Sequence, residues 1–240
     1  AELFQQEAEA AAILSHPQII QIYDVGEVDE FIYFTMQLIQ CEPLTNRLKR
    51  VKKQVLPSKR FMPVKMIIQI MTQILEALDY AHRQGIIHRD IKPANIMIEE
   101  HTQRPIITDF GVAKVIREAK EDHSIARGSP LYMPPEQILD QSTDERSDLY
   151  AAGIMLFEML VPKLPLPKFE SYEDLLKQKL LNQRGIFLKK PSELNPFLNT
   201  MMDQIVLKAM AYEPEKRYEN CCELKKALEE YQKKYLHRLP

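Results

Sequence analysis

The chain has 240 residues, of which 45% are hydrophobic, and its 32 Lys and Arg against 34 Asp and Glu give a formal net charge of −2. This length is enough for one large or two small globular domains with a sizeable core. The near balance of charge argues against a nucleic acid or a membrane surface as partner. The longest apolar stretch falls short of a membrane span, and the first ten residues lack a signal-peptide pattern, so we expect a soluble domain.

The first part of the chain predicts a helix, two strands and a second helix. Residues 3–14 are rich in Ala and Glu and predict a helix that ends before Pro17. Residues 19–28 and 31–39 are β-rich and are joined by a short acidic turn, which indicates an antiparallel pair. From Val64 to His82 apolar residues recur at helical spacing, and Gly85 ends this helix.

The second part is predicted to be mainly helical. Short strands and loops are expected over residues 85–114, and residues 115–146 are polar and irregular. Helical patterns return, between Pro-rich breaks, over residues 147–160, 172–182, 199–211 and 219–235. The expected class is therefore α+β, with a small strand-containing front and a large helical body. The three cysteines, Cys41, Cys221 and Cys222, lack metal-ligand spacing and are typical of free thiols in a reducing compartment.

Two short motifs carry the chemistry: HRDIKPANI at residues 88–96 and TDFG at 108–111. They bring together the carboxylates of Asp90 and Asp109, the amide of Asn95 and the ammonium of Lys92. Such a set suits the positioning of a metal–triphosphate while a carboxylate orients a hydroxyl. Alone, Asp90 would more often be a turn-capping residue. The other three residues in register favour a role in phosphoryl transfer.

These motifs resemble the H-R-D-x-x-x-x-N catalytic loop and the D-F-G of protein kinases. Residues 10–27, 89–98 and 191–218 look most like bacterial Hanks-type serine/threonine kinases, and the resemblance implies a bilobal protein-kinase-like fold. Residues 1–40 would form an incomplete N-terminal β lobe (helix C and the last strands), and residues 41–240 a mainly helical C-terminal lobe. The implied reaction transfers the γ-phosphate of ATP to a protein Ser or Thr.

The resemblance implies a role for each motif residue. Asp90 would be the catalytic base, and Lys92 would neutralise charge on the transferring phosphate. Asn95 and Asp109 would hold Mg²⁺, a hard cation that prefers oxygen ligands. His88 would be structural and would pack on Phe110.

On the nucleotide side, residues 31–40 resemble the last strand of the small lobe running into the hinge. Met36 would be the gatekeeper, the backbone of Gln37 and Ile39 would bind adenine, and Met97 would form the floor of the adenine pocket. Met and Ile at such places are also ordinary core residues. Pro43 stands where a polar ribose partner is often found, which leaves the ribose contacts open.

Four residues have implied regulatory roles. Arg89 would grip a phosphorylated activation loop through a charge-assisted contact. Ser124 is the candidate phosphosite, with a solvated loop serine as the alternative. Ser129, in the segment GSPLYMPPE at 128–136, stands where the family has a threonine that contacts the catalytic Asp and Lys. Glu7 would be the helix glutamate that pairs with a strand lysine.

Three further residues have implied structural roles. Glu136 would form a buried ion pair with Arg217, which fixes geometry more than it adds stability. Asp148 would receive backbone N–H groups from the catalytic loop. Its alternative role is a helix-start cap, which Ser147 could fill equally well.

Two parts of the family pattern are absent from these residues. The six glycines include no G-x-G-x-x-G, and the first lysine is Lys49, so Glu7 has no strand-lysine partner. We expect the sequence to enter the family fold about three strands late. The strand pair within residues 19–39 would then have an open edge and an uncovered apolar face.

Two alternatives stay open beside the kinase. The first is a pseudokinase, or a catalytically impaired fragment, that acts as an interaction module. The second is a small-molecule phosphotransferase of related fold, which Arg89, the D-F-G and residues 128–136 disfavour. The expected location is the cytoplasm, either free or as the cytoplasmic domain of a membrane-anchored kinase.

Overall fold

The computed structural model of the chain describes residues 13–28, 31–110 and 130–236. Most of the helix predicted over residues 3–14 lies outside them. The predicted roles of Glu7, Ser124 and Ser129 also fall on residues outside the described ranges.

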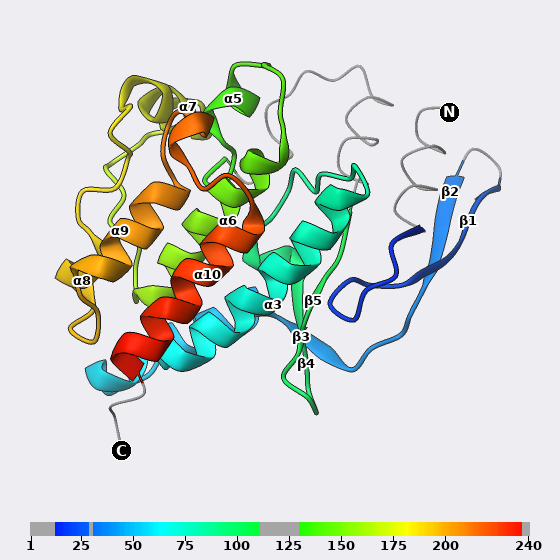
Figure 1. The fold of residues 1–240 in the computed structure, drawn as a ribbon, viewed down its shortest axis with the longest axis horizontal. Helices are drawn as coiled ribbons and strands as arrows, with labels where there is room; N and C mark the ends of the chain where they lie inside the picture. Colours follow the sequence, from blue (N-terminus) through cyan, green and yellow to red (C-terminus); the bar gives the residue numbers. More distant parts are fainter. Residues whose placement is uncertain (1–12, 29–30, 111–129, 237–240) are drawn as a thin grey trace.

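The first two strands, β1 (Ile22–Val28) and β2 (Phe31–Met36), pair antiparallel, as the sequence predicts. The pairing runs from Ile22 opposite Met36 to Val28 opposite Phe31, with an irregularity between Ile22 and Asp24. Among the described residues this sheet has only these two strands. In Figure 1 it lies at one side of a body made of helices.

A second, three-stranded sheet connects this pair to the helices. Its strands β3 (Cys41–Pro43), β4 (Ile96–Glu99) and β5 (Pro105–Ile107) are antiparallel, in that order. Ile107 also contacts the segment before β1, because its N–H donates to Gln18 O at 2.8 Å and its carbonyl accepts from Ile20 N at 2.9 Å. The strand pair is therefore attached to the body at this point as well as through residues 37–40.

The body is built on two long helices, α3 (Val64–Arg83) and α6 (Glu145–Leu160). Helix α6 is buried on nearly all sides, whereas α3 is amphipathic and buries ten residues. Residues 57–83 are long and apolar enough for a membrane span, contrary to the sequence-based expectation, but 56% of the apolar 18-residue window within them is buried inside the protein. Helix α3 is therefore a core helix.

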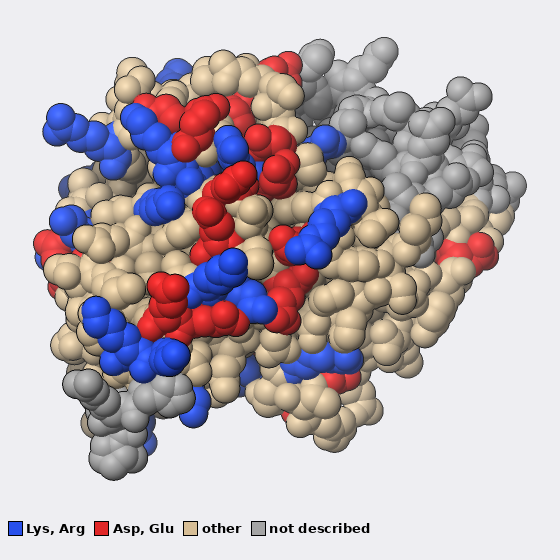
Figure 2. Space-filling view, viewed as in Figure 1, with Lys and Arg blue, Asp and Glu red and all other residues tan. Residues whose placement is uncertain are grey.

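Shorter elements surround these two helices (Figure 1). They are α2 (Leu44–Lys52), η1 (Pro57–Arg60), η2 (Pro93–Asn95), α5 (Pro135–Ile138), α7 (Tyr172–Leu181), α8 (Pro191–Leu194), α9 (Thr200–Ala209), η4 (Pro214–Lys216), α10 (Cys221–Tyr231) and the π-turn η5 (Gln232–Leu236). Helix α10 packs against α3, and α9 packs against α6. On the face drawn in Figure 2, acidic and basic side chains are interspersed, with no large patch of one sign.

Candidate active site

The HRD loop, which begins at His88, is held in place by one buried carboxylate. Asp148, in α6, is fully buried and accepts hydrogen bonds from the backbone N–H of His88 at 2.9 Å and of Arg89 at 2.8 Å. Arg89 has a positive φ of 63°, a conformation that is costly for a residue with a side chain. The two hydrogen bonds offset that cost, and the anchoring role predicted for Asp148 is confirmed. Asp144, not Ser147, caps α6, accepting from Arg146 N at 2.8 Å.

Asp148 also contacts a histidine that the sequence did not single out. His82 Nε2 lies 2.8 Å from Asp148 Oδ2, and His82 Nδ1 lies 3.7 Å from the buried thiol of Cys221. Burial by itself would raise the pKa of Asp148, but the hydrogen bond and the charge of His82 outweigh it and lower that pKa. Helices α3, α6 and α10 thus meet beneath the loop through this chain of three side chains.

His88 links the loop to the TDFG segment. Its Nε2 lies 2.9 Å from Thr108 O, which can only accept, and its Nδ1 accepts from Asp90 N–H at 3.2 Å. These partners select the neutral tautomer with the proton on Nε2. Its ring also packs edge-on against Phe110, with 4.6 Å between centroids. The predicted structural contact between these two residues is therefore present.

Asp90, Lys92 and Asn95 form one hydrogen-bonded cluster. The Lys92 ammonium donates to Asp90 Oδ2 at 2.6 Å, and Asn95 Nδ2 donates to the same oxygen at 3.1 Å and to Asp90 O at 2.9 Å. The three side chains are largely shielded from solvent. Pro93 starts the 3₁₀ turn η2, which brings Asn95 back onto Asp90. The carboxylate is therefore held in one orientation.

Asp109 follows β5 and is joined to this cluster through the backbone. Thr108 N–H donates to Asn95 O at 2.9 Å, which aligns the two motifs. Asp109 has a φ of 63° and an exposed side chain, whereas Phe110 is buried. A cavity of about 70 Å³ brings Asp109 together with residues of the first sheet; its lining is Ile19, Ile20, Ile22, Phe34, Met36, Asp109 and Phe110.

The predicted nucleotide residues lie at the junction of the two sheets. Met36, 46% exposed, reaches the same cavity as Asp109. Gln37 donates its N–H to Gln21 O at 2.9 Å, so its carbonyl is the group left to meet an adenine. Ile39 O accepts from the Cys41 thiol at 3.4 Å, which leaves its N–H for the same purpose. Met97 lies in β4 opposite Pro43 and is not among the residues lining the 70 Å³ cavity.

The donor set fits Mg²⁺ bound together with a polyphosphate. Within the described residues no group of three His, Cys, Asp or Glu could hold a metal alone. Mg²⁺ is commonly held by one or two protein oxygens plus phosphates and water. Asn95 uses its NH₂ on Asp90, so its amide oxygen remains available, and Asp109 adds an exposed carboxylate. These two residues would supply the protein oxygens.

The remaining predicted residues fall in two groups. Glu136 and Arg217 form the predicted buried ion pair through two hydrogen bonds of 2.7 Å each, and the hydroxyl of Ser147 donates to Glu136 at 2.8 Å. Burial raises the pKa of Glu136, but the hydrogen bonds and charge of Arg217 outweigh burial and lower it. Arg89 is partly buried at its strained position, while its predicted partner Ser124 is outside the described residues.

Sequence reasoning missed a second set of contacts around residues 130–133. Tyr132 donates its hydroxyl to Glu158, which also accepts from Lys52 at 2.9 Å. The ammonium of Lys179 reaches the backbone of the same segment. No local sequence pattern predicts these contacts, because each joins residues more than 25 positions apart.

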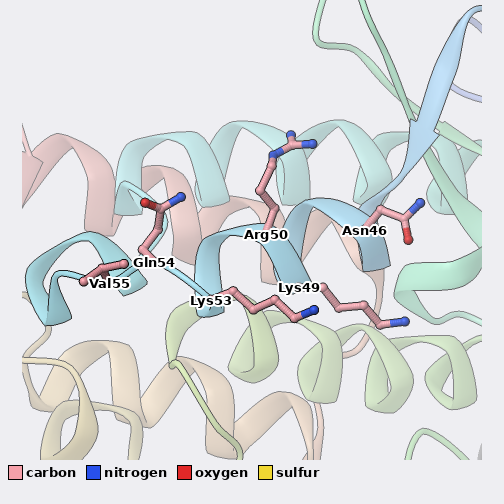
Figure 3. Close-up of a pocket in the computed structure, with 6 residues that line it drawn as sticks. All are labelled: Asn46, Lys49, Arg50, Lys53, Gln54 and Val55. Atoms are coloured by element: carbon pink, nitrogen blue, oxygen red, sulfur yellow. The ribbon is translucent and has the colours of Figure 1, made fainter.

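A larger hollow of about 490 Å³ lies away from these motifs, over the C-terminal half of α2. Figure 3 shows its lining: Asn46, Lys49, Arg50, Lys53, Gln54 and Val55. The ammonium groups of Lys49 and Lys53 point to one side of α2, while Arg50 points to the other and pairs with Glu42 at 2.7 Å. None of the motif residues lines it.

Comparison with known proteins agrees with this geometry. A family model described as a protein kinase domain matches residues 2–231. The chain is 34% identical over 219 residues to the serine/threonine-protein kinase PrkC of Bacillus subtilis, covering 90% of this chain and 31% of that protein. It is 32% identical over 235 residues to PknB of Mycobacterium tuberculosis, covering 92% and 34% respectively. It therefore spans about a third of the length of the curated relatives it matches.

A comparison of structures gives the same result. The crystal structure of the PknI kinase domain of Mycobacterium tuberculosis superposes with a TM-score of 0.72 at 27% identity, covering 95% of this chain and 78% of that one. The helical body with two small sheets is thus a protein-kinase fold. With the HRD loop, its aspartate anchor and the matched family model, the chain belongs to the protein kinase family, as a relative of bacterial Hanks-type serine/threonine kinases.

Proposed function

We propose that this chain carries the active site of a protein kinase that transfers the γ-phosphoryl group of ATP to a Ser or Thr hydroxyl of a protein. The observation that carries the proposal is the Asp90 carboxylate, fixed by Lys92 at 2.6 Å and by Asn95 at 3.1 Å. An acceptor held in one orientation is what a reacting hydroxyl needs. The names of the relatives, which are serine/threonine kinases, support the same substrate class.

In this proposal Asp90 orients the substrate hydroxyl. Both contacts to its carboxylate use Oδ2, so Oδ1 is the acceptor for the hydroxyl proton. As the hydroxyl oxygen bonds to the γ-phosphorus, the bond from phosphorus to the bridging oxygen of ADP breaks, and the proton passes to Asp90. Lys92 has three N–H groups and places one on Asp90, so the others are available for phosphate oxygens.

Asn95 and Asp109 would hold Mg²⁺ through the amide oxygen and the carboxylate. When bound, the ion neutralises charge on the phosphates. Gln37 and Ile39 would orient the adenine through the backbone, with Met36 and Met97 against the ring. Because ATP is a cytoplasmic substrate and the three cysteines are free thiols, we place the domain in the cytoplasm.

The first prediction concerns Asp90→Asn. The amide keeps the size of the side chain but cannot take a proton, so we expect kcat for phosphate transfer to fall by roughly 10²- to 10⁴-fold. Transfer of radiolabelled phosphate from ATP to a protein acceptor measures this. The melting temperature should stay within a few degrees of the unsubstituted protein, because the side chain is replaced by one of the same shape.

Asp140→Asn is the matched control. Asp140 is exposed and has a φ of 53°, a conformation that Asn adopts readily, so this exchange should leave transfer unchanged. Undiminished turnover in Asp90→Asn would refute the assignment. Binding of Mg·ATP in calorimetry without any transfer would instead favour the interaction-module alternative.

A further inference from the structure

Lys179 is a buried lysine whose contacts the catalytic site does not explain. It lies in α7 with 2% of its surface exposed, which is rare for lysine. Its Nζ donates to the carbonyl oxygens of Leu131 at 2.8 Å, Pro130 at 3.2 Å and Met133. An ammonium has three N–H groups, and here three carbonyls receive them. The charged form therefore matches this backbone segment fully.

The ammonium has no carboxylate partner within ion-pair distance among the described residues. It lies 5.0 Å from the centre of the Tyr150 ring, and the guanidinium of Arg217 lies 4.9 Å from the same ring. Glu136, the acid whose charge acts on Lys179, is already paired with Arg217 at 2.7 Å. Burying a cation in this way costs free energy that an apolar side chain of equal length would avoid. In return, the ammonium fixes the three carbonyl groups in place.

Residues 130–133 are held from a second side as well. The hydroxyl of Tyr132 binds Glu158 in α6, and Glu158 binds Lys52 in α2 at 2.9 Å. Helix α2 follows β3 directly and packs against η2, the turn that carries Asn95. The segment is therefore fixed between α7 and a chain of contacts that leads to the Asp90 loop.

We propose that Lys179 is a positioning residue for the protein substrate: its ammonium holds residues 130–133, and with them the contacts that lead to the Asp90 loop, in the arrangement that receives a segment of the protein substrate. This rests on the proposed kinase function and deepens it. The nucleotide residues lie elsewhere, on β2, on the connection after it and on β4. A change at Lys179 should therefore alter the binding of the protein substrate and leave the binding of ATP unchanged.

The charge of Lys179 changes near neutrality, which gives the proposal a specific readout. Burial lowers its pKa to about 7, with Glu136 opposing that effect and Arg217 adding to it. Burial also raises the pKa of Tyr150, which therefore stays neutral across this range. The other ionisable groups around the neighbouring cavity, of about 140 Å³, are Arg184 and Tyr212. A neutral amine keeps two N–H groups and turns a lone pair toward the third carbonyl, so deprotonation releases one contact.

The experiment compares Lys179→Met with Lys177→Met, an exposed lysine of the same helix. KM for a peptide and KM for ATP are measured from about pH 6 to about pH 8.5, a range that spans the Lys179 transition. For the unsubstituted protein and for Lys177→Met we expect the peptide KM to rise above pH 7. For Lys179→Met we expect a peptide KM raised roughly tenfold at the acid end and independent of pH. KM for ATP should be the same in all three proteins.

A second measurement does not need activity. Hydrogen exchange at the amides of residues 131–133 should be faster in Lys179→Met than in Lys177→Met, relative to the amides of α3. If phosphate transfer is absent but this difference is present, the proposed function fails, while the hold of Lys179 on residues 130–133 stands. An unchanged exchange rate, or a peptide KM that follows the same pH profile in both variants, overturns the proposal. So does a loss in kcat alone.

Discussion

Arg217 is a buried charged side chain whose donors are all used. Its five N–H groups make five hydrogen bonds: two to Glu136, and one each to the carbonyls of Ala211, Arg146 and Tyr212. Its side chain is 0% exposed and that of Glu136 5%. One guanidinium thus joins α5, the start of α6 and the loop before η4. Breaking such a pair costs far more than the pair contributes, because one buried charge is left alone.

We therefore expect Arg217→Met to lower the free energy of unfolding by about 3–5 kcal/mol. The loss comes from the unpaired carboxylate of Glu136 and from three carbonyls without donors. Chemical denaturation with urea, followed by circular dichroism, measures the change.

Lys216→Met is the control from the next position along the chain. Lys216 pairs with Glu213 at 2.9 Å, but the lysine side chain is 69% exposed. Such a pair is screened by water, and its removal should leave the unfolding midpoint unchanged. Equal losses of unfolding free energy in the two variants would show that the buried Glu136–Arg217 pair stabilises the protein no more than an exposed pair does.

At the scale of elements, the sequence predicts the helices and strands that have a regular apolar pattern. The strand pair β1–β2 and the helices α3, α6, α7, α9 and α10 all follow from apolar patterns. Helix α2 was missed because its buried residues are only Leu44 and Leu48 in an otherwise polar and basic stretch. The four-residue helix α5 is too short to show a period.

The candidate site likewise has residues that the sequence predicts and contacts that it does not. Asp90, Lys92, Asn95 and Asp109 stand in two short motifs that the sequence identifies, and the backbone hydrogen bond from Thr108 to Asn95 joins Asp109 to the other three. Lys179 could not be found from the sequence, because a lysine in a polar helix is normally exposed. Its carbonyl partners lie 46 to 49 positions away, and only tertiary packing makes them neighbours.

The packing of α6 on α9 depends on Gly153. A Cβ at this position would lie 2.8 Å from Met210 Cγ and 2.9 Å from Ala209 Cβ, both closer than real contacts allow. Alanine favours a helix over glycine by about 0.5–1 kcal/mol, but overpacking a core costs about 1–3 kcal/mol. We expect Gly153→Ala to lower the melting temperature, as measured by calorimetry. A rise would mean that Ala209 and its helix move aside at little cost.

At the scale of the whole molecule, stability is unevenly distributed. The helical body has a continuous core, to which α6 contributes most of its residues and α3 the ten residues of its buried face. The strand pair β1–β2 leaves large apolar side chains in solvent: Tyr23 is 66% exposed, and Leu38, just after β2, is 97% exposed. An isolated two-stranded sheet is marginal in water. Within the described ranges it is attached through residues 37–40, the backbone contacts to Ile107 and the side chains around the 70 Å³ cavity.

This difference predicts two classes of hydrogen exchange in these 240 residues. Amides of β1 and β2 should exchange by local opening, with a free energy that hardly changes as low concentrations of denaturant are added. Amides in the middle of α3 and α6 should exchange only by global unfolding, so their free energy of exchange should fall steeply with denaturant. Native-state exchange read by mass spectrometry separates the two classes.

The strands β4 and β5 provide the internal control. They are also an antiparallel pair, but Ile96, Ile98 and Ile107 are completely buried, so their amides should exchange with the helices. If β1–β2 exchange with the same free energy and denaturant dependence as β4–β5, the chain unfolds as one unit. The predicted lobe boundary between residues 40 and 41 would then not separate two units of different stability. If they exchange separately, the half of the site that contains Met36 opens while the Asp90 loop remains folded.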